Sequence, residues 1–131
     1  MTRFADDLWA RAQDAFRLAK HDLPLSADGA ASWAYYAAFY AVSAHFAVQR
    51  RTFRKHTAVE AAVHRDLVEA GLWPQDLGRG FSDLVHMRDV GHYGGSEHVT
   101  PEEAKRAIEI AGRILRAVAD ANPDTFKGLF E

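Results

Sequence analysis

The fold is decided by residues 29–49, which read GAASWAYYAAFYAVSAHFAVQ. These 21 residues contain no Asp, Glu, Lys or Arg, so the stretch is long enough to span a bilayer. It nevertheless carries serine, tyrosine and histidine, and most of its aliphatic residues are alanine, whereas a membrane span is normally richer in Leu, Ile and Val. An apolar helix at the centre of a small bundle fits this composition better, because a helix that is apolar on nearly every side is typical of a buried position.

On both sides of this stretch, apolar residues recur at spacings of three and four, which predicts four further helices. They are expected at residues 4–20, 57–70, 74–93 and 101–121. The segments 57–60 and 100–103 both have the capping-box pattern that starts a helix, and no alternating strand pattern competes. The sequence therefore predicts an all-α fold: an up-and-down antiparallel bundle of about five helices, forming one domain over residues 1–131.

Composition excludes several classes of function. Sixteen Lys and Arg against 18 Asp and Glu give a net charge of −2, which argues against a uniformly basic, generic polyanion binder. The absence of cysteine excludes disulfides, Cys-ligated metal sites and thiol catalysis. The seven histidines form no His-x-x-x-His or Glu-x-x-His pair, so neither a metal nor a cofactor is expected. An acidic start without a signal-peptide pattern leads us to expect a cytoplasmic protein.

The most informative chemistry lies in residues 81–95. Arg88 and His92 continue the helical face of Phe81 and Val85, since the spacings are four, three and four. Arginine offers a fixed fork of donors to a phosphodiester, and histidine can exchange a proton near neutral pH. Two cations near the end of a helix also stabilise the helix dipole, so the spacing by itself leaves a structural interpretation open.

A basic connector, residues 50–56, is the local positive cluster of the sequence. Its cations are Arg50, Arg51, Arg54 and Lys55. They could contact an RNA backbone, or they could be a solvated loop that suits the end of the preceding helix, and the two interpretations are equally weighted. His56, at the end of the connector, is interpreted as a structural residue that hydrogen bonds into the loop.

Four segments, in order along the chain, resemble one bacterial and archaeal branch of the HEPN family. Residues 35–41, followed by Ala44, resemble the central helix with its Ala-Tyr-Tyr-Ala core, and residues 53–56 resemble its Phe-x-Lys-His element. Residues 88–93 resemble Arg-x-x-Ala-Asp-Tyr, and residues 99–104 resemble the start of the last helix. The resemblance covers roughly residues 5–119 and implies the same helical fold.

The resemblance also implies a function. Many HEPN proteins are homodimeric, metal-independent endoribonucleases of toxin or defence type, and one large group is held in check by a nucleotidyltransferase. It implies that Arg88 stabilises phosphate, that His92 is the general acid or base, and that Asp89 orients one of them. Tyr93, next to His92, either contacts RNA in the cleft or is a packing residue. Three residues separate Arg88 from His92, whereas the nuclease pattern has four to six. The alternative is a non-catalytic HEPN module that binds RNA, a nucleotide or a partner nucleotidyltransferase.

Overall fold

All regular structure in the described part of the chain is helical. The computed structural model describes residues 2–127, apart from the side chains of Thr2, His92 and Tyr93. Its elements in chain order are α1 (Thr2–Asp22), α2 (Ala27–Val48), α3 (His56–Ala62), the π-helical segment η1 (Val63–Val68), α4 (Gln75–Tyr93) and α5 (Pro101–Ala121). No strand occurs within residues 2–127. The predicted all-α fold is confirmed.

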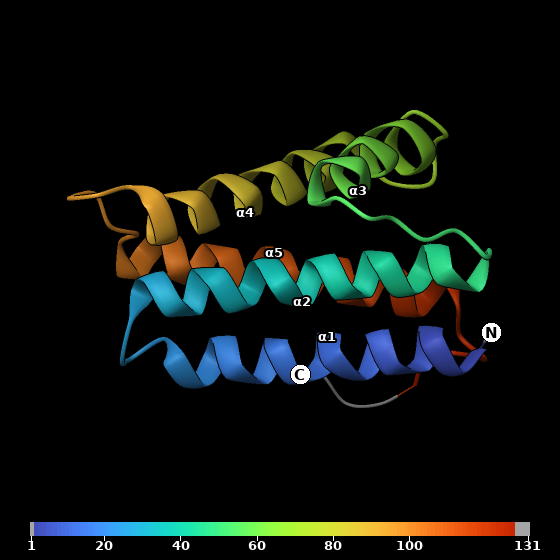
Figure 1. Ribbon diagram of the computed structural model, residues 1–131, viewed down its shortest axis with the longest axis horizontal. Helices are drawn as coiled ribbons and strands as arrows, with labels where there is room; N and C mark the ends of the chain where they lie inside the picture. Colours follow the sequence, from blue (N-terminus) through green and yellow to red (C-terminus); the bar gives the residue numbers. More distant parts are fainter. Residues whose placement is uncertain (1, 128–131) are drawn as a thin grey trace.

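The helices form an antiparallel bundle around α2 (Figure 1). Helices α1 and α2 lie side by side and run in opposite directions, α5 lies behind α2, and α4 slopes across the top with α3 and η1 beside its first turns. Helix α2 packs against α1, α5 and α4, and the buried apolar side chains form one contiguous core cluster. The uncharged run at 29–49 thus belongs to the central helix, as the sequence predicts, although α2 begins two residues earlier and ends at Val48.

Small side chains allow this central position. Seven alanines of α2 are completely buried: Ala30, Ala31, Ala34, Ala37, Ala38, Ala41 and Ala44. Because a methyl group projects so little, the neighbouring helices can approach the α2 backbone closely and remain in van der Waals contact. No helix within residues 2–127 is long and apolar enough to cross a membrane.

The helix starts show where local sequence signals succeed and fail. The Thr100 hydroxyl accepts the Glu103 N–H and the Glu103 carboxylate accepts the Thr100 N–H, so the capping box predicted at 100–103 is confirmed. The capping box predicted at 57–60 is wrong, because α3 already begins at His56 and its N-cap, Lys55, makes no side-chain capping bond. The Glu60 carboxylate instead accepts a hydrogen bond from the Ser82 hydroxyl of α4.

The segment that follows α3 widens into a π-helix, where the sequence predicts a continuous α-helix. The Glu69 N–H donates to the His64 carbonyl, five residues earlier, at 2.9 Å. Val68, at the end of this segment, faces Gly78 of α4, where an added Cβ would lie 2.5 Å from a Val68 methyl. Apolar spacing cannot distinguish a single π turn from an α turn, which explains the difference.

A neutral histidine joins α2 to the end of α5. His45 is 8% exposed, and the Asn122 side-chain amide donates to its Nδ1 at 3.0 Å. Burial lowers the pKa of His45 from its ordinary value of 6.5. An imidazole that accepts at Nδ1 cannot also carry a proton there, so protonation of His45 would break this bond.

We expect Ala38→Leu to destabilise the fold by about 1–3 kcal/mol, because the larger side chain has no room between α2 and its neighbours. Ala10→Leu is the matched control, since Ala10 lies exposed on α1. Urea unfolding of both variants checks the prediction. Equal stability of the two variants would contradict close packing around α2.

Stability should fall as the pH drops below about 6.5. The unfolded chain then binds a proton at His45 that the folded chain, with its lowered pKa, does not bind, so the free energy of unfolding decreases with falling pH. Urea unfolding between pH 7.5 and 5 measures this slope. We expect His45→Gln to flatten the slope and His21→Gln, at an exposed position on α1, to leave it unchanged. An equal slope in both variants would refute the assignment.

Candidate functional site

Arg88 lies at the seam between α4 and α2. Its side chain is 19% exposed, and its Nη1 donates to the Asp89 carboxylate at 3.3 Å. Its Nη2 donates to the Tyr36 hydroxyl at 3.4 Å, and its guanidinium carbon lies 5.2 Å from the centre of the Tyr35 ring. Aromatic faces attract a cation, so these contacts hold the positive charge at the edge of the core.

His56, the first residue of α3, joins the same aromatic cluster. Its Nδ1 and the Tyr35 hydroxyl hydrogen bond at 2.7 Å, and its ring stacks on Phe39 with centres 4.2 Å apart. The sequence interpretation placed His56 in the loop, but the contacts show that it bonds to α2. Only tertiary structure could reveal this, because Tyr35 and His56 are 21 residues apart.

The environment sets the protonation of this pair. Burial raises the pKa of the Tyr35 phenol, although the positive charge of Arg88 opposes the effect. Although the edge of His56 is exposed, burial of its stacked face, together with the Arg88 charge, lowers its pKa. Near neutral pH, Tyr35 is therefore a neutral phenol and His56 a neutral imidazole beside a permanent cation.

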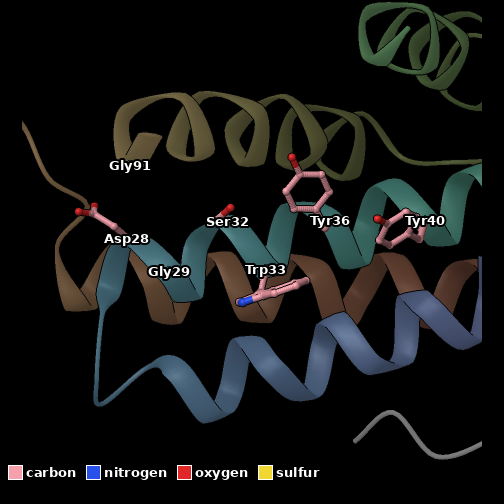
Figure 2. Close-up of a pocket in the computed structure, with 7 residues that line it drawn as sticks. All are labelled: Asp28, Gly29, Ser32, Trp33, Tyr36, Tyr40 and Gly91. Atoms are coloured by element: carbon pink, nitrogen blue, oxygen red, sulfur yellow. The ribbon is translucent and has the colours of Figure 1, made fainter. Parts of the chain in front are cut away.

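An open groove of about 510 Å³ runs along α2 (Figure 2). It is lined by Asp28, Gly29, Ser32, Trp33, Tyr36, Tyr40 and Gly91. Figure 2 shows Tyr36 pointing from α2 toward α4, whereas Trp33 lies on the side of α2 nearer α1. Because the Tyr36 hydroxyl also bonds Arg88, one side chain connects the groove to the cation.

Asp28 closes the end of the groove. Its Oδ1 accepts the Val99 N–H at 2.7 Å and its Oδ2 lies 2.7 Å from His98 Nδ1, so it ties α2 to the segment before α5. Gly91 of α4 lies so close to Asp28 that an added Cβ would already be in contact at 3.4 Å. This ordinary van der Waals distance shows that α2 and α4 are in direct contact at this end of the groove.

A second polar network lies between α3, η1 and α4. The Ser82 hydroxyl donates to Glu60 at 2.6 Å, and His64 Nε2 lies 2.8 Å from the same oxygen. Glu60 and His64 are four residues apart and share one helix face, and both contact the same Ser82 hydroxyl. No group of three or more His, Cys, Asp or Glu suited to a metal ion occurs in the described part of the chain.

The basic connector divides into one paired and three exposed cations. Arg51 bonds Asp66 at 2.7 Å and lies 4.7 Å from the centre of the Phe46 ring. Hydrogen bonds from Arg65 and Arg51 lower the pKa of Asp66 to about 2. The exposed cations are Arg50, Arg54 and Lys55. The connector thus contributes both a structural ion pair and a charged surface.

Of the residues predicted on α4, Arg88 and Asp89 have described side chains, whereas His92 and Tyr93 do not. Asp89 contacts Arg88, as expected if it orients the guanidinium. His92 and Tyr93 belong to the last turn of α4, but their side chains lie outside the described residues. Tyr35, Tyr36 and His56 complete the surroundings of Arg88. The Lys-His element marked His56 in the sequence, but nothing there indicated its contact with the Arg88 cluster.

Comparison with known families shows to which family the chain belongs. The sequence model of the HEPN domain matches residues 5–121. The chain belongs to the HEPN family. The match includes the central helix, the connector and Arg88, so the features that form the site all lie within the HEPN domain.

Two relatives of this HEPN protein are described only as UPF0332 proteins. One, from Thermotoga maritima, is 34% identical over 84 residues, which are 64% of this chain and 64% of the relative. The other, from Gloeobacter violaceus, is 28% identical over 119 residues, covering 88% of this chain and 94% of the relative. The aligned part thus spans slightly less than two thirds of the Thermotoga protein, and neither description states an activity.

Proposed function

We propose that this HEPN protein is a metal-independent endoribonuclease of toxin or defence type that works in the cytoplasm. The observation that carries the proposal is the Arg88 guanidinium, which the rings of Tyr35 and Tyr36 hold in place, while Tyr36 and Tyr40 line a groove along α2. Proteins bind unpaired RNA bases by stacking them on aromatic side chains and bind the phosphates through cations. The groove and Arg88 offer both surfaces side by side.

The proposed reaction uses the RNA 2′-hydroxyl as the nucleophile on the adjacent phosphorus. Arg88 stabilises the developing charge on the phosphate oxygens, since its fork matches two of them. Asp89 orients the guanidinium through its hydrogen bond. His92, four residues after Arg88, acts as the general acid or base. Tyr93 and the cations of the connector contact the RNA strand: Arg50, Arg51, Arg54 and Lys55.

A second candidate function is binding without cleavage. The groove volume of about 510 Å³ lies within the range of small-molecule sites, and its walls combine aromatic rings with Asp28 and Ser32. A nucleotide, an RNA segment or a partner nucleotidyltransferase acting as antitoxin could occupy it. The cleavage test below separates this function from the nuclease.

Cleavage of labelled RNA in EDTA tests the lead proposal. We expect wild-type protein to cleave, and Arg88→Ala or His92→Ala to reduce the rate by about 10²–10⁴-fold, because each removes charge stabilisation or proton transfer in the transition state. Arg113→Ala is the control, since Arg113 forms an exposed ion pair on α5. An inert wild-type protein that still binds labelled RNA would favour the binding function instead.

We further propose a homodimer formed through the α2 face. Trp33 is 36% exposed on the groove wall, and a large exposed aromatic ring is typical of the centre of an interface. Sedimentation at micromolar concentration should give twice the mass of the chain. Trp33→Glu should convert it to a monomer, whereas Leu72→Glu, at an exposed position on the far end of the bundle, should not. A wild-type monomer would exclude the dimer.

A further inference from the structure

The pair formed by Tyr35 and His56 is not explained by packing alone. Tyr35 is 1% exposed, and the hydrogen bond to His56 Nδ1 gives its hydroxyl a partner at 2.7 Å. Stacking on Phe39 fixes the plane of the imidazole ring. His56 is nevertheless an exposed residue. The Tyr35 hydroxyl therefore occupies Nδ1 of an exposed imidazole, and Nε2 remains for a ligand.

The pair lies next to the proposed phosphate-binding cation. The Arg88 guanidinium is 5.2 Å from the Tyr35 ring centre and 5.7 Å from that of Tyr36, and the His56 ring is about 6 Å from both. The positive charge of Arg88 also contributes to the lowered pKa of His56. A phosphate drawn to Arg88 would thus arrive beside the same two tyrosines that flank His56.

Three other histidines with described contacts serve elsewhere. His45 is buried against Asn122, and His64 bonds Ser82. His98 bonds Asp28 at the end of the groove. His56 combines an exposed ring, a fixed orientation and contact with the tyrosines that hold Arg88.

We propose that His56 is a catalytic residue of the Arg88 site, where its Nε2 accepts the proton of the RNA 2′-hydroxyl. The inference rests on the proposed ribonuclease function. The bond from O2′ to phosphorus forms as that proton moves to Nε2, and the bond from phosphorus to O5′ breaks. The O5′ leaving group takes a proton from His92, so the products are a 2′,3′-cyclic phosphate and a 5′-hydroxyl. Tyr35 is the positioning residue: in the reactive tautomer Nδ1 carries the proton and donates a hydrogen bond to the Tyr35 hydroxyl oxygen, which leaves the Nε2 lone pair free.

The charges around His56 favour this role. Burial of its stacked face and the positive charge of Arg88 lower its pKa, so the ring is unprotonated and able to accept a proton near neutral pH. The titratable and charged groups around it are Tyr35 and Tyr36 on α2 and Arg88 on α4. Asp89 and Glu60 act on its partner Tyr35. The rate of cleavage should therefore rise with pH along an acid limb whose midpoint is below 6.5.

The test compares RNA cleavage in EDTA by wild type, His56→Gln, Tyr35→Phe and the control His21→Gln. We expect His56→Gln to lose about 10²–10⁴-fold in rate and to lose the acid limb, since no group remains to accept the proton. Tyr35→Phe should reduce the rate less, because the imidazole remains but is no longer held. His21→Gln should match wild type. Added imidazole should restore cleavage to His56→Gly, which a purely structural role would not allow.

The outcomes separate this inference from the proposed function. Wild-type rates in His56→Gln, beside an inactive Arg88→Ala, would overturn the role of His56 and leave the ribonuclease proposal standing. A slow His56→Gln protein that keeps the acid limb, with a His56→Gly protein that imidazole does not rescue, would also overturn it. An inert wild-type protein would overturn both. Circular dichroism melting of each variant shows whether the fold is retained.

Discussion

The structure depends on the close approach of helices to the backbone of α2. A helix can be surrounded on three sides only if its contact faces are small, and the buried alanines of α2 meet that condition against α1, α4 and α5. Because this packing fixes the position and rotation of α2, it also fixes the directions in which the larger side chains of that helix project. Tyr35 and Tyr36 project toward α3 and α4, as their contacts with His56 and Arg88 show. The packing of the core thus determines where the aromatic cluster forms.

The aromatic cluster in turn makes a mostly buried cation tolerable. Removing a guanidinium from water is costly unless other groups replace its hydration. Arg88 receives that replacement from two ring faces, the Tyr36 hydroxyl and the Asp89 carboxylate. A cation held in this way is already oriented, so an anion that binds it does not have to order a flexible side chain.

Much of the fold follows from local sequence signals, whereas the site does not. The uncharged run, the 3.6-residue periodicity and the Thr100 capping box are properties of neighbouring residues, and each was sufficient to predict its element. The capping box predicted at 57–60 does not form, since α3 begins at His56 and Glu60 bonds Ser82 of α4, and the π-helical turn cannot be distinguished by apolar spacing. Arg88 could be selected from the sequence because it continues the helical face of Phe81 and Val85, and Asp89 because the resemblance to the HEPN family marks it. The link between Tyr35 and His56 joins separate helices, so no spacing rule contains it.

Asp28 connects the groove to the segment that precedes α5. Its carboxylate holds the Val99 backbone and His98 immediately before α5 begins, while its own backbone borders Gly91 in the groove. Any molecule that draws on this carboxylate competes with the anchor of the segment between α4 and α5. By thermodynamic linkage, the occupancy of the groove and the order of that segment then influence each other by the same free energy. A change in the order of the loop before α5 therefore accompanies binding of any molecule that engages Asp28 in the groove.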